Sequence, residues 1–521
     1  MNRKQKHLGE TWKSKRMYNL ALFIILSLLV VACSPFGESS KVAPDPPKAT
    51  HMETSPEPTE KLSSPTLTST SNMQVPQIIP GDWPGYLLDN SSFNSEEATI
   101  NLQTAPQLRV YWKYHANGGV TAQPVVVNDT LYWGSWDGLE HATTLDGKEI
   151  WATNLGETTD HDPDCDPSSV GVASTAAIVP MSIGGKMTLV DFVGGGDATF
   201  YALNAANGHI IWKTPLRSAF GDFIWSSPAV YKGSIYVGVA SFGDCPGVQG
   251  KLVQLNAETG AIRNTLKVVP DGCAGGPIWS SPTIDRSTGE IYISTGNFSS
   301  CSTTEGYAEA LMELHASNLA VVGSWQVPPS DRVLDGDFGS TPTLFNATIN
   351  GVSRPMVGTI NKNGIYYAFI RGAISAGPAW RAQISWLPRC SVCEGPGNIS
   401  PAAWDGSRLY IAGANTTING AQCQGDVRAV DPATGKFIWE RCFPDARPMA
   451  PIAGVPGIVV VGEGQYVNVL DATSGKTLFV YQDRMYGSVF YGAPSIAHGI
   501  LFIGNINGNL FAFKYYRLPI H

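Results

Sequence analysis

The chain of 521 residues holds 35 Lys and Arg against 43 Asp and Glu, together with 55 glycines and 36 prolines. Such a composition is typical of a turn-dense all-β protein. The acidic balance argues against nucleic acid as a partner, because a groove for phosphates needs clustered Lys and Arg and the sequence shows no such cluster.

Residues 1–32 are predicted to be a signal peptide. A basic leader precedes an apolar run from Leu20 to Ala32, which is too short to span a bilayer comfortably. The sequence Val30-Val31-Ala32-Cys33 resembles the lipobox of bacterial lipoproteins, which implies that Cys33 is lipidated and begins the mature chain. We therefore expect a membrane-anchored lipoprotein outside the cytoplasm, at the cell surface or in the periplasm. An uncleaved anchor would leave the rest of the chain in the same place.

Residues 33–80 are rich in Pro, Ser and Thr, with hardly any apolar clusters, and are predicted to be a disordered tether. The chain after the tether is predicted to be one domain over residues 81–514, followed by a short C-terminal tail at 515–521. The mature chain would carry 29 basic and 42 acidic residues.

A docking unit repeats along this domain, and its clearest copy is AVDPATGKFIW at 429–439. Gly435 suits a turn with positive φ, and Trp439 then supplies a large apolar plate with one N–H to satisfy. A small residue such as Ala429 is expected to leave room for the plate of a neighbouring copy. Eight outer strands, 39 to 61 residues apart, are predicted around Trp112, Trp151, Trp212, Asn264, Trp325, Trp380, Trp439 and Phe479.

A second repeat, a hairpin of two short apolar strands that begins near a Pro, runs in step with the first. It occurs at 123–134, 227–238, 281–294, 400–413, 450–462 and 493–504. Hairpin plus docking unit makes about four strands per repeat, and eight such repeats predict an eight-bladed β-propeller. The last copy breaks off at Ala512-Phe513-Lys514, so the strand around Trp112 should complete it and close the ring. A β-sandwich would not explain this split blade.

Cysteine usage also fits an exported protein. Eight cysteines besides Cys33 are expected to form disulfides rather than a metal site, and they stand at 165, 245, 273, 301, 390, 393, 423 and 442. Cys423 and Cys442 flank the 429–439 hairpin and should face each other across it. Glu394 follows the Cys390–Cys393 pair where covalent haem attachment would need His, so no c-type haem is expected.

The opening DWPGYLLDNSSFNS at 82–95, the Trp-docking repeats and the blade count resemble the pyrroloquinoline-quinone (PQQ) alcohol dehydrogenases. Within that family the chain is similar to the polyvinyl-alcohol dehydrogenase type without a cytochrome domain. The resemblance implies PQQ and Ca²⁺ as cofactors, a small or polymeric alcohol as substrate and a separate electron acceptor. The same repeats occur in propellers that bind no quinone, including the scaffold lipoprotein of outer-membrane protein assembly. A non-catalytic surface scaffold that binds proteins or polymers is therefore the alternative.

The resemblance also implies site residues. In GGPIWSSPTIDRSTGEIYISTGN at 275–297, Trp279 stands where the family places a Trp beneath the quinone, and Asn297 where it places a calcium ligand. The alternatives are blade packing for Trp279, because IWSSP recurs around Trp225, and a polar turn for Asn297.

The segment LDGDFGSTP at 334–342 resembles the family's Trp-Asp-x-Asp, with Leu334 in place of Trp. Asp335 then takes the place of the general base and a calcium ligand, and Asp337 is the second carboxylate. In NKNG at 361–364, Lys362 is the residue expected to reach the quinone. The alternative for both segments is a solvated polar turn.

The sequence departs from the family after the strand YVGVAS at 236–241, whose last residue, Ser241, is assigned to the cofactor. Family members place a calcium-binding Glu shortly afterwards, whereas SFGDCPG here offers only Asp244 as a metal ligand. The adjacent Cys-Cys pair of many family members is also absent. The absence of the Glu or of the Cys-Cys pair would be expected in a propeller that has kept the pocket but lost its cofactor.

Overall fold

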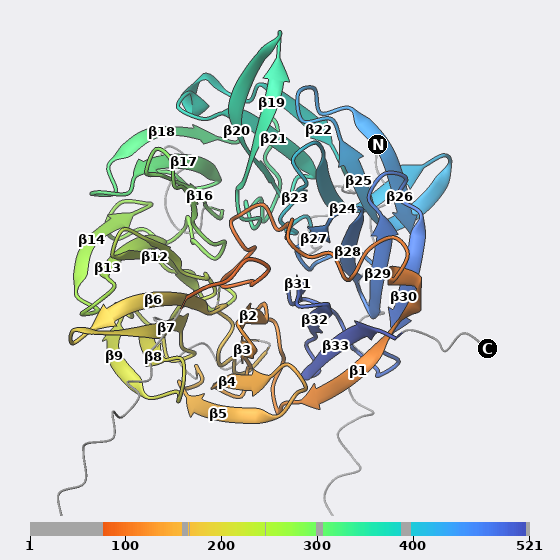
Figure 1. Cartoon of the computed structure of the whole chain (residues 1–521). Helices are drawn as coiled ribbons and strands as arrows, with labels where there is room; N and C mark the ends of the chain where they lie inside the picture. The colour runs from red at the N-terminus through yellow and green to blue at the C-terminus, as the bar shows by residue number, and fades with distance from the viewer. Residues whose placement is uncertain are drawn as a thin grey trace, which may run out of the picture. The chain divides into compact units, whose positions relative to one another are not determined.

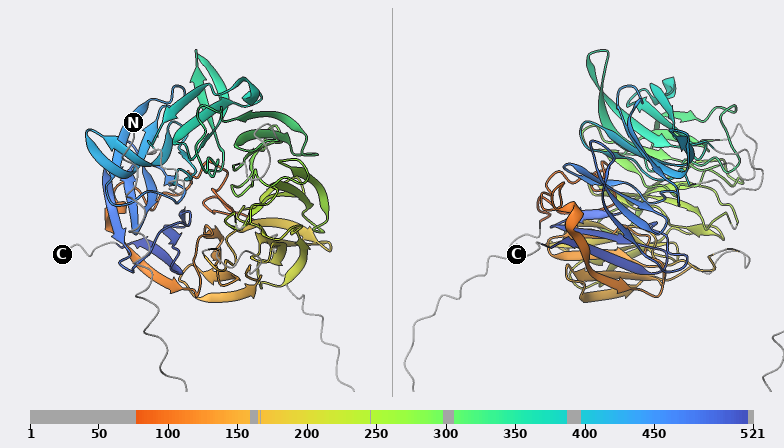
Figure 2. Two further views of the ribbon diagram at one scale, coloured as in Figure 1. Left: turned by 180° about the vertical axis from the view of Figure 1, so that it is seen from behind. Right: turned by 90° about the vertical axis from the view of Figure 1, so that its right-hand side faces the viewer.

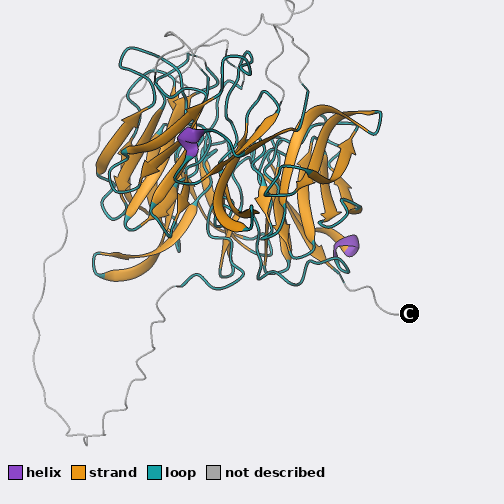
Figure 3. Cartoon of the chain, turned by 90° about the horizontal axis from the view of Figure 1, so that it is seen from above, coloured by secondary structure: helices purple, strands orange, loops and turns teal. Residues whose placement is uncertain are grey.

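The strands form eight antiparallel sheets that stand like blades around a common axis (Figure 1). The structure is a computed structural model and describes residues 77–158, 165, 167–244, 246–297, 306–386 and 397–516. It contains two single-turn 3₁₀ helices, η1 (Ala105–Gln107) and η2 (Ile374–Ala376), and otherwise strands and loops in this range (Figure 3). The predicted all-β, eight-bladed propeller is confirmed.

The first four blades follow one another along the chain, each with its inner strand first. Blade 1 is β2 (Val125–Val127), β3 (Thr130–Gly134), β4 (Leu139–Thr144) and β5 (Glu149–Asn154). Blade 2 is β6 (Ala177–Ile183), β7 (Lys186–Gly194), β8 (Thr199–Asn204) and β9 (Ile210–Pro215). Blade 3 is β10 (Asp222–Phe223), β11 (Ala229–Tyr231), β12 (Ser234–Ser241), β13 (Lys251–Asn256) and β14 (Ile262–Lys267). Blade 4 is β15 (Thr283–Asp285), β16 (Glu290–Ser294), β17 (Ala310–His315) and β18 (Val321–Gln326).

The remaining blades continue the ring. Blade 5 is β19 (Thr343–Ile349), β20 (Val352–Ile360), β21 (Ile365–Ile370) and β22 (Trp380–Gln383), and its β19–β20 hairpin projects beyond the disc (Figure 2). Blade 6 is β23 (Ala403–Trp404), β24 (Leu409–Ile418), β25 (Ala421–Val430) and β26 (Phe437–Phe443). Blade 7 is β27 (Ala453–Val455), β28 (Ile458–Glu463), β29 (Tyr466–Asp471) and β30 (Thr477–Gln482).

Blade 8 joins the two ends of the described chain. Its inner strands are β31 (Ser495–Ala497), β32 (Ile500–Gly504) and β33 (Asn509–Tyr515), and its outer strand is β1 (Leu108–His115). Trp112 on β1 pairs with Ala512 on β33 in an antiparallel register. The predicted split blade is therefore confirmed, and it leaves the ring no open junction.

In five of the eight blades the tryptophan of the docking unit fastens its blade to the next one by a hydrogen bond. Trp439 of blade 6 donates a 3.0 Å hydrogen bond from Nε1 to the carbonyl oxygen of Ala472 in blade 7. Its indole lies on Gly475 (φ 68°), where a Cβ would come within 2.6 Å of the ring. The same bond, at 2.8 to 3.1 Å, links the pairs Trp112–Leu145, Trp151–Ala205, Trp212–Ala257 and Trp380–Pro432.

One detail of the predicted docking is wrong. Ala429 lies directly opposite Trp439 within its own sheet, so its small side chain makes room for the indole of its own blade. Opposite residues on paired strands point to the same face, which explains the pairing. The plate from the neighbouring blade, that of Trp380, instead rests on Gly435 of the turn.

Hydroxyl groups join the blades near the axis. The backbone N–H of Gln123 donates to Thr175 Oγ1 (2.7 Å), and that of Thr175 donates to Ser227 Oγ (3.0 Å). The series continues from Ser227 N–H to Ser281 Oγ at 2.9 Å and from Ser281 N–H to Thr341 Oγ1 at 3.0 Å. Because these atoms are buried, each bond satisfies a backbone donor that folding has removed from bulk solvent.

The segment 82–95 crosses the centre of the ring (Figure 1). It pairs with blade 1 through Trp83 and Val126 and with blade 7 through Phe93 and Gly454. The backbone N–H of Trp404 in blade 6 donates to Ser91 O over 2.8 Å. These contacts tie the segment to blades 1, 6 and 7, so it covers one end of the central channel.

The disulfide predicted between Cys423 and Cys442 is confirmed, with a Cα–Cα distance of 5.4 Å between β25 and β26. Cys165 and Cys273 are also disulfide-bonded. The remaining cysteines, with the predicted lipidation site Cys33, lie outside the described residues. Within the described part of the chain, no helix is long and apolar enough to cross a bilayer.

Two carboxyl groups, Glu140 on β4 and Asp191 on β7, are fully buried at the junction of blades 1 and 2. None of their four oxygens has a hydrogen-bond partner among the described residues. Burial raises the pKa of Asp191 to about 8. Burial and the neighbouring Asp191 raise the pKa of Glu140 well above its usual range. Both groups are therefore neutral at acidic pH and resist ionisation inside the fold.

Deleting residues 105–116 should open the ring, because blade 8 loses β1 and exposes the edge of β33. We expect aggregation, or a large fall in the thermal unfolding midpoint measured by calorimetry. Deletion of 34–75, the sequence predicted to be a tether, is the control and should leave the midpoint unchanged. Equal behaviour of the two truncations would show that β1 does not close the ring.

Asp191→Asn should stabilise the protein at alkaline pH. An unfolded Asp has a pKa of about 4, whereas that of folded Asp191 is about 8. The unfolded chain therefore binds fewer protons between these values, so stability falls as pH rises through this window. The variant should show a higher midpoint than wild type at pH 8, little difference at pH 4 and a flatter profile between them. Asp129→Asn, at an exposed position, is the control; an unchanged profile in Asp191→Asn would contradict the assignment.

Candidate functional site

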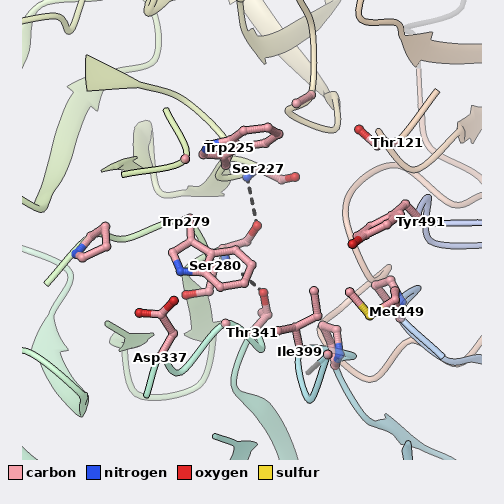
Figure 4. Close-up of a pocket in the computed structure, with 18 of the residues that line it drawn as sticks. Thr121, Trp225, Ser227, Trp279, Ser280, Asp337, Thr341, Ile399, Met449 and Tyr491 are labelled. Atoms are coloured by element: carbon pink, nitrogen blue, oxygen red, sulfur yellow. Dashed lines mark hydrogen bonds between the residues drawn. The ribbon is translucent and has the colours of Figure 1, made fainter. Parts of the chain in front are cut away.

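A cavity of about 650 Å³ lies where the inner edges of the blades converge (Figure 4). Its walls come from every blade, which is possible only near the axis of the ring. The lining residues used below are Thr121, Trp225, Ser241, Asp244, Trp279, Asp335, Asp337, Gly339, Lys362 and Tyr491. We call this cavity the axial pocket.

A simple sequence rule finds much of the lining. Thr121, Trp225, Trp279, Gly339 and Tyr491 each stand three residues before the Pro that opens an inner hairpin, and all five line the axial pocket. The chain runs toward the axis at this point before it turns into the inner strand. Sequence reasoning singled out the two tryptophans and missed the other three positions, although the recurring Pro was the signal that could have located them.

Trp279 forms a flat wall of the axial pocket. Its indole lies against Gly339 of the next blade, where a Cβ would come within 2.1 Å of the ring. Glycine is therefore required here to let the ring pack against the backbone. The Nζ atom of Lys362 lies 5.5 Å from the centre of the same ring, within the range of a cation–π contact.

Lys362 bridges two carboxylates at the edge of this indole. Its Nζ lies 2.7 Å from Asp335 Oδ1 and 2.7 Å from Asp337 Oδ2. Burial alone would lower the pKa of Lys362, but Asp337 and Asp335 outweigh that effect and raise it. The lysine therefore stays charged.

The two carboxylates differ in how deeply they are held. The side chain of Asp337 is 6% exposed, whereas that of Asp335 is 31% exposed. Asp337 Oδ1 also accepts a 2.5 Å hydrogen bond from the backbone N–H of Asn297. Asp337 is thus a positioning group, while Asp335 faces the pocket with more of its surface.

Glu309 lies behind this pair. Burial raises the pKa of Glu309 to about 7, although Arg332, at 3.3 Å, lowers it, and the charge of Asp337 raises it further. A change in the charge of Asp337 will therefore shift the pKa of Glu309.

Ser241 and Asp244 line the same pocket from blade 3. Ser241 Oγ donates to Asp244 Oδ1 over 2.7 Å, and the Asp244 backbone N–H donates back to Ser241 Oγ over 3.1 Å. Trp225 donates from Nε1 to the Ser241 carbonyl oxygen at 3.1 Å. Trp225 is thus a second indole on the pocket wall, fixed by a hydrogen bond of its own.

The structure brings together most of the residues that the sequence singled out. Trp279, Lys362, Ser241, Asp244 and Asp335 all line the axial pocket. Asn297 does not line it; its backbone, rather than its side chain, contributes the bond to Asp337. The assigned roles of these residues stay predictions.

The arrangement suits a planar ligand better than a calcium ion. A flat indole wall next to a cation fits a planar, negatively polarised ring system. The position between the carboxylates of Asp335 and Asp337, where a cation would lie, is taken by the Lys362 ammonium. In the described part of the chain, no three His, Cys, Asp or Glu residues are grouped to hold a metal ion.

Sequence comparisons find similarity to two kinds of protein. The family described as outer membrane protein assembly factor BamB matches residues 97–323. A polyvinylalcohol dehydrogenase of a Pseudomonas species is 24% identical, and the alignment covers 82% of this chain and 74% of the relative. The outer membrane protein assembly factor BamB of Yersinia pestis is also 24% identical, with 81% of this chain and 94% of the relative covered.

Solved structures share the fold. The quinohemoprotein alcohol dehydrogenase of Comamonas testosteroni superposes with a TM-score of 0.64 at 19% identity, covering 85% of this chain and 82% of that one. A europium-containing methanol dehydrogenase gives a TM-score of 0.67 at 15% identity, covering 84% of this chain and 98% of that one. The predicted resemblance to the quinoprotein alcohol dehydrogenase propellers is thus confirmed.

Lys362→Met should destabilise the protein, because it leaves the buried charge of Asp337 without its partner. Removing one member of a buried ion pair costs about 3–5 kcal/mol. Urea unfolding should show this loss, and Lys362→Met/Asp337→Asn should recover part of it. The exposed Lys436→Met is the control. A stability change no larger than that of the control would mean that the ion pair contributes nothing to the fold.

Proposed function

We propose that the axial pocket binds a planar quinone of the PQQ type and that the protein is an alcohol dehydrogenase. The observation that carries the proposal is the Trp279 indole, packed closely against Gly339, with Lys362 beside the ring and Asp335 paired to that lysine. The similarity to a polyvinylalcohol dehydrogenase supports an alcohol, small or polymeric, as the substrate.

The bound quinone would supply the chemistry of hydride acceptance. Asp335 is the residue suited to take the proton of the alcohol hydroxyl, because it is the more exposed of the two carboxylates. Lys362 orients this carboxylate and balances its charge. Trp279 supports the plane of the ring, and the Ser241 hydroxyl, which already donates to Asp244, is available to the quinone as an acceptor.

Calcium is not needed for this arrangement, since Lys362 already supplies the positive charge next to Asp335. The predicted ligand set of Asn297, Asp335 and Asp244 is therefore left as a hypothesis for the binding experiment. Electrons would pass to a separate acceptor. We further propose that the protein is exported and held at a membrane through lipid on Cys33.

A second function, a non-catalytic scaffold for protein or polymer partners, is favoured by the charge of the axial pocket. Its lining includes Asp244, Asp335 and Asp337, whereas Lys362 is the single Lys or Arg among the described lining residues. PQQ carries several carboxylates, which such a wall attracts poorly. The similarity to BamB proteins supports the same alternative.

PQQ binding separates the two functions. Titration of the protein with PQQ, with and without Ca²⁺, should change the quinone absorbance if the axial pocket accepts it. Stacking on an aromatic side chain is worth about 1–3 kcal/mol for nucleic-acid bases. On that scale Trp279→Ala should weaken binding by about one to two orders of magnitude, while Trp386→Ala, at an exposed position outside the axial pocket, should not. No absorbance change at saturating PQQ in either condition would leave the scaffold as the function.

Asp335→Asn tests the chemistry separately from binding. The change keeps the size of the side chain and removes the base, so dye-linked alcohol oxidation should be lost while PQQ affinity is largely retained. Oxidation at the wild-type rate in this variant would show that Asp335 is not the proton acceptor.

A further inference from the structure

One junction between blades lacks the aromatic plate that the other seven have. Asn264 on β14 of blade 3 stands where the docking Trp or Phe stands elsewhere. The residue opposite Asn264 is Gln254, whereas Ala lies opposite Trp112, Trp151, Trp212, Trp380 and Trp439. Asn264 Nδ2 donates to Gln254 Oε1 over 2.7 Å, so a polar pair replaces the Trp–Ala pair.

The next blade still offers the acceptor that a docking indole would use. The carbonyl oxygen of Ala316 in blade 4 corresponds in the repeat to those of Ala205 and Ala257, which accept indole N–H bonds. Here it accepts Tyr236 Oη–H at 2.6 Å and Gln254 Nε2–H at 3.1 Å instead. Side chains of blade 3 therefore supply the hydrogen bonds to this carbonyl, but they do not fill the space that an indole would occupy.

The missing plate leaves a cavity of about 440 Å³ between blades 3 and 4, which we call the interblade slot. Its lining residues are Tyr231, Lys232, Ser234, Tyr236, Gln254, Arg263, Thr288, Gly289, His315, Ala316 and Ser317. The floor is made of polar side chains that are nearly inaccessible: Tyr236 is 2%, Gln254 3% and Ser234 4% exposed. Hydrogen bonds to one another and to Ala316 hold these three side chains in place, so the floor of the slot is well defined.

The charge of the interblade slot is opposite to that of the chain. Lys232, Arg263 and His315 line it, and no carboxylate is among its described lining residues. Arg263 donates a hydrogen bond from Nη1 to Ser234 Oγ at 2.6 Å. A guanidinium has five N–H donors, so further donors remain for a ligand. Lys232 lies over the Tyr231 ring at 4.9 Å, and His315 Nδ1 lies 3.1 Å from Glu290. In a protein with an acidic excess, this grouping needs an explanation.

We propose that the interblade slot is a binding site for a small molecule that carries a carboxylate or phosphate group. Arg263 and Lys232 would hold the anionic group, since a guanidinium offers paired donors that match the oxygens of either anion. The hydroxyls of Tyr231 and Ser234 would bind its polar remainder. This site is independent of the axial pocket and of the quinone chemistry proposed there.

Calorimetric titration at constant ionic strength tests the site, because the screening of charges then stays the same as the anion is added. Inorganic phosphate and citrate are the two probes, and binding of one but not the other identifies the anionic group. We expect Arg263→Gln to weaken binding by about tenfold or more. Arg354→Gln, an exposed arginine on β20, is the matched control. Failure of wild type to bind either probe, or unchanged affinity in Arg263→Gln, would overturn the proposal.

A second variant tests the origin of the slot. Gln254→Ala/Asn264→Trp restores the pair found in the other blades, and its indole should fill the space. An anion that binds the slot should raise the thermal unfolding midpoint of the wild-type protein. We expect the variant to have a higher midpoint than wild type without the anion, and to show no further rise when the anion is added. Anion-dependent stabilisation that persists in a folded variant would place the anion outside the slot.

Discussion

The contact on which this structure depends is the one between a docking indole and the following blade. A four-stranded sheet has two apolar faces and cannot bury both alone, so each blade needs a neighbour on either side. The indole meets this need with a large apolar area and one N–H, and a carbonyl in the turn of the next blade accepts that N–H. Because each contact points to the next blade, the series ends only when the ring closes through β1.

Closure of the ring creates the axial pocket as a geometric consequence. The chain approaches the axis before every inner strand, so residues from all eight blades converge on one space. The indole contacts that fasten one blade to the next lie further out, at the outer strands. The pocket can therefore hold Trp279, Lys362 and two aspartates, with a charged group buried at the axis, in a frame that is stabilised elsewhere.

The interblade slot lies at the one junction where the docking aromatic residue is missing. Where the repeat omits its plate at Asn264, the blades stay together through an apolar cluster that they share and through the polar contacts of Gln254 and Tyr236 with Ala316. The space is then available to a ligand. The two sites have opposite charge, since carboxylates dominate one lining and cations the other, so they would select different molecules.

The sequence by itself determined the repeat, the blade count, the split blade and the Cys423–Cys442 disulfide, because each depends on local patterns: a turn, an alternation of apolar residues, or a motif that recurs along the chain. It also marked the residues of the axial pocket that stand in motifs, such as Trp279 and Asp335. Only the tertiary structure decided that Lys362 bridges Asp335 and Asp337, that Asn297 contributes its backbone, and that Ala429 faces its own Trp439. Those relations join residues from different turns and strands, and their distances depend on how the blades pack rather than on any local pattern. The buried pair of Glu140 and Asp191 and the interblade slot were likewise invisible, since burial and empty volume are properties of the packed ring.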